Sequence, residues 1–285
     1  MQKYSQKAYA KINLSLNVLG KRRDGYHEVS MVMHQITLAD IISLSRCSGA
    51  GIILTSDSEQ IPLDERNIAY QAAQIMQKEF NLSDGVKIHI KKDIPVAGGL
   101  AGGSTDAAAV LCLMNTAYSL GLSRIQLMKL GLRLGADVPY CIFSKPALAE
   151  GIGESLTEIE GLAPCKIIIV NPCVEISTKT VYEAMDSCAD TAPAQNKALI
   201  NALRNGDNGN AFSYMKNAME QVSIGLCPQI AEIIDTLMSA GAQHAMMSGS
   251  GATCFGIFSK NSDLTEIHKL FPGYIVRECE PYYGE

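Results

Sequence analysis

The hydrophobic and polar positions in the first part of the chain alternate with a period of two. The alternation covers residues 9–20 (YAKINLSLNVLG) and residues 28–45 (EVSMVMHQITLADIISLS), and it returns in residues 86–92 (VKIHIKK). A period of two places every second side chain on the same face of a strand. The pattern therefore predicts two long strands near the N-terminus and a shorter strand before residue 95.

Apolar residues with helical spacing lie between and after these strands. They recur three and four positions apart in residues 64–80 and residues 106–120, and again in residues 124–135, which follow Ser123. Serine is a favoured N-cap, so Ser123 marks the start of the last of these helices. The first half of the chain is thus predicted to combine long strands with three helices.

The second half of the chain has a different texture, with one apolar strand followed mainly by helices. The predicted elements are a buried strand over 165–172, helices over 178–188, 194–205, 209–222 and 228–242, a strand, glycine turn and strand over 244–259, a helix over 262–270 and a strand over 274–279. Strands and helices do not alternate regularly, which favours the α+β class. The change in texture predicts two domains, residues 1–160 and residues 161–285.

Composition and charge exclude several classes of protein. Hydrophobic residues make up 47% and charged residues 19% of the 285 residues, as in ordinary globular domains. The net charge of −5 provides no broad basic surface, so neither nucleic acid nor a membrane is an expected partner. The nine cysteines are odd in number and form no C-x-x-C pair, which argues against a disulfide framework and a zinc site. With no apolar signal segment at the N-terminus, we expect a cytoplasmic protein.

A glycine-rich stretch, PVAGGLAGGSTD at residues 95–106, follows a predicted strand and precedes a predicted helix. The first amide groups of a helix lack partners, and glycines allow a phosphate to approach them closely. A Rossmann fingerprint would need glycine at Ala97, and a Walker A loop would need lysine at Ser104. The stretch therefore predicts a phosphate cradle of neither standard class, with a tight packing turn as the alternative.

The same stretch closely resembles the central motif of the GHMP kinases. Residues 10–28, 134–143 and 247–258 resemble one branch of that superfamily, whose acceptor is 4-diphosphocytidyl-2-C-methyl-D-erythritol. The resemblance implies a two-lobed α+β fold, with an N-terminal lobe like ribosomal protein S5 domain 2 and a ferredoxin-like C-terminal lobe. ATP and the acceptor would meet in the cleft between the lobes. It also implies ATP-dependent phosphorylation of the acceptor's 2-hydroxyl, a step of isoprenoid and terpenoid biosynthesis by the non-mevalonate route.

The resemblance assigns the nucleotide site to the glycine stretch and two residues before it. The loop that would wrap the phosphates of ATP comprises Pro95, Val96, Ala97, Gly98, Gly99, Leu100, Ala101, Gly102, Gly103, Ser104 and Thr105. The hydroxyls of Ser104 and Thr105 would bond phosphate or a water on Mg²⁺; on the residues alone they are helix N-caps. Asn67 and Lys92 would bind adenine, although Lys92 could equally be a solvated charge at a strand end. Asp106 lies near the expected Mg²⁺ or serves the helix dipole, so no protein ligand is assigned to the metal.

The resemblance assigns phosphoryl transfer to Lys11 and Asp137. Asp137 would accept the hydroxyl proton, and Lys11 would keep that carboxylate ionised and stabilise the developing alkoxide. The pair Val138 and Pro139 is expected to fix the backbone after Asp137, because a residue before proline avoids the helical region. Without the resemblance, Lys11 would be interpreted as a solvated strand residue.

The acceptor site is implied by resemblance as well. Tyr26 would stack on the cytosine and His27 would read its edge, with a turn histidine bonded to backbone as the alternative for His27. Tyr182 would be a second aromatic contact with Thr178 beside it, and Asn13 would contact the erythritol or diphosphate part.

Two alternatives and one further motif complete the expectations. The glycine motif at residues 248–253 (SGSGAT) lies near the acceptor or its phosphates, or is a plain hairpin turn. The chain could be a GHMP kinase for another acceptor, or a nucleotide-binding regulator without catalysis. The expected partner is a small molecule with a cytidine diphosphate group, bound by a monomer or weak homodimer.

Overall fold

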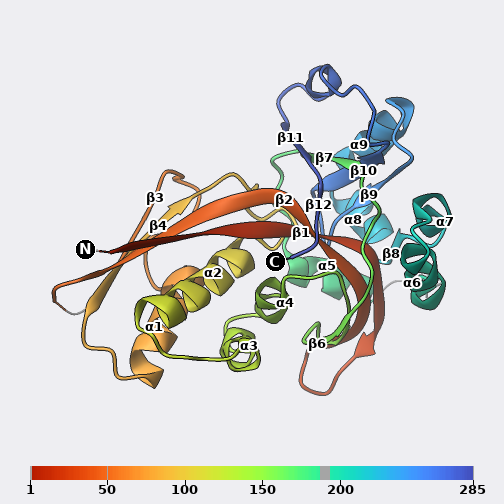
Figure 1. The fold of residues 1–285 in the computed structure, drawn as a ribbon. Coiled ribbons are helices and arrows are strands. Elements are labelled where there is room, and N and C mark those ends of the chain that lie inside the picture. The colour runs from red at the N-terminus through yellow and green to blue at the C-terminus, as the bar shows by residue number, and fades with distance from the viewer. Residues whose placement is uncertain (1, 50, 187–192, 285) are drawn as a thin grey trace. The chain divides into compact units, whose positions relative to one another are not determined.

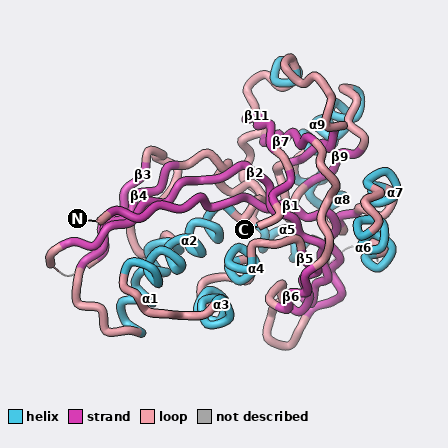
Figure 2. The backbone as a smooth tube through the Cα atoms, viewed as in Figure 1, coloured by secondary structure: helices cyan, strands magenta, loops and turns pink. Residues whose placement is uncertain are grey.

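The computed structural model describes residues 2–49, 51–186 and 193–284, and it divides the chain into two compact units. Each unit is assembled from separate stretches of the chain. Unit 1 comprises residues 1–10, 39–96 and 101–144, and unit 2 comprises residues 11–38, 97–100 and 145–285. Helices and strands are mixed in both units (Figure 2). The two domains predicted from the sequence, residues 1–160 and 161–285, remain a prediction.

The sheet of unit 1 is built on two long strands, β1 (Lys3–Lys21) and β2 (His27–Cys47), which contribute residues to both units (Figure 1). Its strand order is β3 (Ile52–Ser56), β4 (Gly85–Lys91), β2 and β1. β4 pairs antiparallel with β2 and parallel with β3. Buried and exposed residues alternate along β4, as its sequence predicts.

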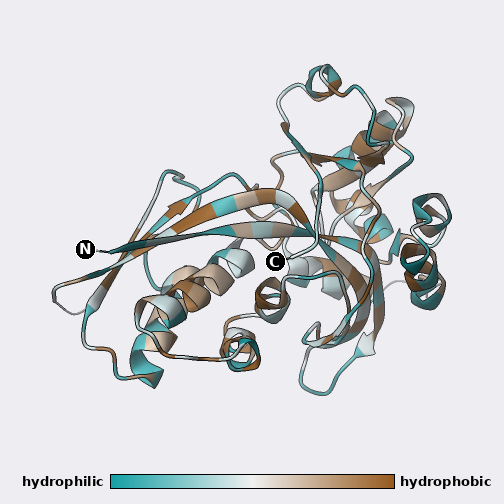
Figure 3. Ribbon diagram, viewed as in Figure 1, coloured by the Kyte–Doolittle hydropathy of each residue, from teal (hydrophilic) through white to brown (hydrophobic). Residues whose placement is uncertain are grey.

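The core of unit 1 lies between this sheet and the helices packed on it. The helices are α1 (Ile68–Glu79), α2 (Gly102–Ala117), α3 (Arg124–Leu132) and α4 (Val138–Phe143). Apolar residues of β2, β4, α1 and α2 form one buried cluster, and Figure 3 shows α2 as largely hydrophobic. Because α2 is buried over most of its length, the position of its N-terminus is fixed by packing.

Unit 2 contains the remaining strands. β5 (Ala147–Gly151) pairs antiparallel with β2 and with β6 (Ser155–Glu158), β8 (Lys216–Asn217) pairs parallel with β1, and β12 (Pro281–Tyr282) pairs antiparallel with β2. A second sheet has the order β11 (Ile275–Cys279), β7 (Lys166–Asn171), β10 (Cys254–Phe258) and β9 (His244–Met247), with every pair antiparallel. The mixture confirms the α+β class.

The described part of unit 2 contains five α-helices. They are α5 (Thr178–Met185), α6 (Asn196–Arg204), α7 (Asn208–Phe212), α8 (Glu220–Leu226) and α9 (Gln229–Ser239), with a 3₁₀ turn at Ile267–Leu270. α9 packs against β9 and β10. The predicted end of the helix over 178–188 lies outside the described residues.

The predicted helix over 209–222 is wrong. α7, β8 and α8 occupy this segment instead, because the Asn217 side chain donates to the carbonyl oxygens of Met247 (3.0 Å) and Gly249 (2.8 Å). These bonds hold the segment in an extended form that pairs with β1. The helix predicted over 262–270 is reduced to the 3₁₀ turn, and the sequence did not predict β3, β5, β6 or α4.

Most of the described cysteines are buried. The buried ones are Cys141, Cys165, Cys227, Cys254 and Cys279, while Cys188 lies outside the described residues. Among the helices that the structure describes, none combines the length and the apolar character needed to cross a membrane.

Candidate active site

The start of α2 has no side-chain cap. Its N-cap is Ala101, a non-glycine residue with φ of 59°, and no side chain accepts a hydrogen bond there. The interpretation of Ser104 and Thr105 as N-caps is therefore wrong, because α2 begins at Gly102 and both lie inside the helix. Thr105 is buried and its hydroxyl donates to the carbonyl oxygen of Tyr9 at 2.9 Å. The first amides of α2 can consequently receive an anion, and the half-buried Ser104 is the hydroxyl nearest to them.

The middle of the glycine loop, residues 97–100, belongs to unit 2 and contacts the 248–253 turn there. Gly99 has φ of 74°, and a Cβ on it would collide with the carbonyl oxygen of Ser248. The Gly99 carbonyl oxygen accepts from the Ser248 hydroxyl at 3.1 Å. The 248–253 turn does join two antiparallel strands, β9 and β10, and it also fixes the position of the glycine loop.

Lys11 is buried beneath this part of the loop. The residue is only 4% exposed, so the alternative interpretation of Lys11 as a solvated strand residue is wrong. The ammonium donates to Asn13 Oδ1 at 2.7 Å and to the Gly99 carbonyl oxygen at 2.9 Å, and the Lys11 amide donates to Leu100 at 3.1 Å. Both acceptors of the ammonium are neutral oxygens. Among the described residues of unit 2, the charge of Lys11 is therefore stabilised by the dipoles of neutral groups and not by a carboxylate.

Asn13 positions the side chain of Lys11. It is fully buried, its Oδ1 accepts from the Lys11 ammonium, and its Nδ2 donates to the sulfur of Met31 at 3.4 Å. Both ends of the amide are therefore engaged inside unit 2. A contact between Asn13 and the acceptor stays a prediction.

Asp137 lies in unit 1, at the residue before α4. Its backbone is helical (φ −81°, ψ −17°), and its carboxylate makes no capping hydrogen bond. The expected restriction of Val138 to extended backbone is wrong, because Val138 is the first residue of α4 with Pro139 next to it. Proline is tolerated in the first turn, where its missing N–H has no partner to lose. The half-buried Asp137 carboxylate is thus not consumed by helix capping.

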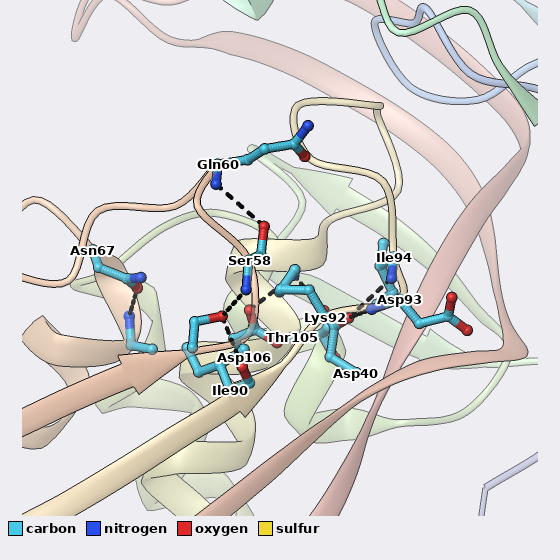
Figure 4. A network of polar contacts seen from close by, with 12 residues as sticks. Asp40, Ser58, Gln60, Asn67, Ile90, Lys92, Asp93, Ile94, Thr105 and Asp106 are labelled. Carbon is cyan, nitrogen blue, oxygen red and sulfur yellow. Dashed lines mark hydrogen bonds and ion pairs between the residues drawn. The ribbon is translucent and has the colours of Figure 1, made fainter. Parts of the chain in front are cut away.

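The two residues predicted to bind adenine have well-defined partners in unit 1. Asn67 is the N-cap of α1: its Oδ1 accepts from the Ala69 amide at 2.9 Å, and its Nδ2 donates to the Pro62 carbonyl at 2.9 Å. The side chain of Lys92 is 7% exposed, so a solvated strand-end charge is wrong. Its ammonium forms ion pairs with Asp40 and, at 3.0 Å, with Asp106 (Figure 4).

Asp106 is buried in the second turn of α2, one turn further into the helix than the sequence predicted. Burial, with the nearby charge of Asp40, raises the pKa of this carboxyl well above its usual range, although Lys92 opposes the rise. For Lys92, burial lowers the pKa, but the charges of Asp106 and Asp40 together outweigh it, and the net pKa is raised. The ion pair, rather than the helix dipole, accounts for the position of Asp106.

The residues predicted to bind cytosine gather at one end of unit 2. Tyr26 is 57% exposed on a turn closed by the bond from the Arg22 amide to the Tyr26 carbonyl at 2.7 Å. The ring of His27 is stacked on that of Tyr182, with centroids 4.3 Å apart and planes at 13°. His27 Nε2 lies 2.8 Å from Asp186 Oδ1, so its partner is a carboxylate and not the backbone. The structure thus brings His27 and Tyr182 together and presents Tyr26 outward.

Three residues of these clusters were missed by the sequence analysis. Asp40 is a carboxylate flanked on both sides by apolar residues (LADII, residues 38–42), which is a usable signal. Ser250 lies within the 248–253 motif but is not distinguished in it, and nothing in the sequence marks Asp186. Asp186 also pairs with Lys21 at 2.7 Å, and Lys21 followed by His27 holds the pKa of Asp186 below its usual value. The Ser250 hydroxyl lies 2.9 Å from that of Thr178, which links the start of α5 to the 248–253 turn.

Comparisons with known proteins show which proteins this chain is similar to. The models for the GHMP kinases N terminal domain and the GHMP kinases C terminal match residues 67–145 and 197–270. The 4-diphosphocytidyl-2-C-methyl-D-erythritol kinase of Clostridioides difficile (strain 630) is 48% identical over 259 residues, which cover 90% of this chain and 87% of that one. That of Caldicellulosiruptor saccharolyticus is 43% identical over 257 residues, covering 90% and 89%.

Solved structures of other kinases are similar to this chain. A crystal structure of 4-(cytidine 5'-diphospho)-2C-methyl-D-erythritol kinase superposes with a TM-score of 0.84 at 29% identity, covering 99% of this chain and all of that one (100%). Homoserine kinase from Cytophaga hutchinsonii, at 17% identity, a TM-score of 0.78 and coverage of 100% and 96%, shares the fold. The chain therefore belongs to the GHMP kinases and, among them, to the family of 4-diphosphocytidyl-2-C-methyl-D-erythritol kinases, whose α+β fold it has.

Proposed function

We propose that this enzyme transfers the γ-phosphoryl group of ATP to the 2-hydroxyl of 4-diphosphocytidyl-2-C-methyl-D-erythritol, giving the 2-phosphate and ADP. The reaction is a step of the non-mevalonate route to isoprenoid precursors. Membership of the family supports the proposal at the level of the whole chain. At the level of the site, the observation that carries it is the Lys11 ammonium, buried against the carbonyl oxygen of Gly99 inside the glycine loop.

The surroundings of Lys11 suit a group that meets phosphate. Burying an ammonium is costly unless it is paired, and its two acceptors, Asn13 and Gly99, are neutral. An ammonium has three donors, so one remains for an anionic ligand. A transferring phosphoryl group carries the missing negative charge, and a lysine held rigidly in place stabilises that charge without reorganisation.

The start of α2 fits the phosphates of ATP. The uncapped amides of Gly102, Gly103 and Ser104 supply donors, and the helix dipole favours negative charge at this end. Mg²⁺, when bound with the nucleotide, neutralises phosphate oxygens, and the Ser104 hydroxyl is the group of the chain suited to one of its waters. Asn67 and Lys92 are the proposed adenine contacts. Each of the two side chains would contact the adenine base in addition to its present partners in unit 1.

The acceptor side of the proposal uses the remaining residues. Asp137, whose carboxylate is free of helix capping, accepts the proton of the attacked hydroxyl. Tyr26 stacks on the cytosine, and Tyr182, whose ring is stacked on that of His27, is the proposed second aromatic contact. Thr178 and Asn13 are proposed polar contacts to the same ligand, a small molecule with a cytidine diphosphate group.

An acceptor panel tests the proposal. The protein is incubated with ATP and Mg²⁺, and with 4-diphosphocytidyl-2-C-methyl-D-erythritol, mevalonate or homoserine in parallel, while ADP release is recorded. We expect ADP only with the first acceptor, and loss of that signal in Lys11→Met. ADP release with homoserine or mevalonate instead would indicate another acceptor, and ATP binding without any ADP release would indicate a regulator.

A further inference from the structure

A buried cluster of three charged residues lies where the chain enters and leaves the glycine loop. It comprises Asp40 on β2, Lys92 just after β4 and Asp106 on α2, and all three belong to unit 1 (Figure 4). Asp40 is completely buried, and the side chains of Lys92 and Asp106 are nearly so. None of the roles assigned above to the kinase reaction requires Asp40.

Asp40 fixes the segment that leads into the loop. One oxygen, Oδ1, accepts from the backbone amides of Asp93 at 2.7 Å and Ile94 at 2.9 Å. The other oxygen accepts from the Lys92 ammonium. A single carboxylate therefore holds three consecutive residues immediately before Pro95, where the loop begins.

Lys92 extends this hold to the segment that leaves the loop. Its ammonium donates to Asp106 Oδ2 at 3.0 Å, in the second turn of α2. It also lies against the first residue of α2, since a Cβ on Gly102 would come within 3.3 Å of Lys92 Nζ. The entrance and the exit of the loop are thus joined through one ammonium group.

The charge pattern argues for a role in geometry rather than in stability. Replacing a buried ion pair by apolar residues of similar size is often neutral or stabilising, so such a cluster adds little stability for its cost. A cation beside the N-terminus of α2 also opposes the helix dipole, and the two carboxylates offset it. What the cluster does provide is a fixed separation between residues 92–94 and the start of α2, where the uncapped amides lie.

We propose that Asp40 is a positioning residue for nucleotide binding, which through Lys92 and the amides of Asp93 and Ile94 holds both ends of the phosphate-binding loop in place. The proposal rests on the proposed function in one respect, the assignment of this loop to the phosphates of ATP. Asp40 itself touches no substrate. Its effect is on the affinity for ATP, and not on the affinity for the acceptor or on the chemical step.

Four variants separate positioning from a structural role. Asp40→Asn keeps an acceptor for the two amides but has no charge for Lys92. Asp106→Ala removes the exit side of the link, whereas Asp106→Asn retains an oxygen that can accept from Lys92. The matched control is Asp57→Asn, because Asp57 is an exposed carboxylate that accepts from the backbone amide of Lys92 at 2.9 Å.

The readout is the Kd for ATP with Mg²⁺, measured by calorimetry without acceptor, beside thermal melting and the acceptor KM. We expect Asp40→Asn and Asp106→Ala to raise this Kd by about 10-fold or more, since small displacements of binding groups are costly. Asp106→Asn should change it by no more than about threefold and Asp57→Asn by about twofold at most. The acceptor KM should not change.

Several results would overturn the proposal. One is a folded Asp40→Asn with lower thermal stability and unchanged Kd for ATP, which is the outcome of a merely structural role. Another is an equal effect of Asp57→Asn. If Asp40→Asn does not fold, the Asp106 pair decides, and equal Kd values for its two variants refute the link. The Kd measurement contains no acceptor, so its outcome is independent of the acceptor panel. A wild-type protein that binds ATP but phosphorylates no acceptor of that panel refutes the proposed function alone. A wild-type protein that binds no ATP refutes both proposals.

Discussion

Gly99→Ala should lower the stability of unit 2 and displace Lys11, the proposed catalytic lysine. Gly99 has φ of 74°, a region that costs an alanine about 1–2 kcal/mol. The new Cβ would also overlap the carbonyl oxygen of Ser248 and lie 3.2 Å from the amide nitrogen of Gly251. Both of these neighbours are backbone atoms of the 248–253 turn, so the loop must move away from that turn.

The movement breaks the two hydrogen bonds that the Gly99 carbonyl oxygen accepts. The bond from the Lys11 ammonium contributes about 1.5–3 kcal/mol and the bond from the Ser248 hydroxyl about 0.5–1.5 kcal/mol. With the backbone strain, we expect a loss of about 3–6 kcal/mol in the free energy of unfolding. Lys11 would keep only Asn13 as an acceptor, so kcat should fall in the fraction that still folds.

Urea denaturation with a two-state fit measures the loss, and Gly103→Ala is the matched control in the same loop. A Cβ on Gly103 would meet only the side chain of Ile68, at 3.5 Å and 3.7 Å, and alanine favours the helix by about 0.5–1 kcal/mol. Gly103→Ala should therefore unfold at the same or a higher urea concentration. A loss of no more than about 2 kcal/mol for Gly99→Ala would refute the packing argument, because backbone strain alone would account for it.

Three further predictions concern catalysis, the acceptor and pH. Asp137→Asn should lower kcat by about 10²-fold or more with little change in ATP affinity, and an unchanged kcat in steady-state assays would remove Asp137 from the mechanism. Tyr26→Ala should raise the acceptor KM by roughly tenfold or more and leave the ATP KM unchanged, whereas Tyr26→Phe should cost little. Its combination with Tyr182→Ala should be non-additive, and equal rises in both KM values would contradict the stacking role. Burial lowers the pKa of His34 to about 4 from 6.5, so the unfolded state binds more protons between these values. The free energy of unfolding should fall by up to about 3 kcal/mol as pH drops from 6.5 to 4, and a His34→Gln variant with the same slope would argue against this cause.

The parts of the fold that were predicted from sequence are those with a long local pattern. The alternation in β1, β2 and β4 and the helical spacing in α1 and α2 lie within each element, and Ser123 forms the capping box with Gln126 that its position suggests. The segment 209–222 was wrong because Asn217 is held by carbonyl groups about thirty residues away, which no local window contains.

The candidate site divides in the same way. The glycines, the following helix and the exposed Tyr26 could be predicted because they depend on neighbouring residues. The burial of Lys11 could not, since it depends on Gly99, and that of Lys92 could not, since its partner Asp40 is fifty-two positions away. Roles for Lys11, Asp137 and Tyr182 came from the resemblance, because charge and spacing alone left a solvated lysine as the simpler interpretation.

The most direct test of the central claim identifies the phosphorylated position of the product by ³¹P NMR. The protein is incubated with ATP, Mg²⁺ and 4-diphosphocytidyl-2-C-methyl-D-erythritol, and proton-coupled spectra are recorded. The 2-carbon carries a methyl group and no hydrogen, so phosphorylation of its hydroxyl should give one new phosphomonoester signal without three-bond coupling to a carbinol proton, beside an intact diphosphate. No new phosphomonoester from this acceptor, or a signal split by a carbinol proton, would contradict the account.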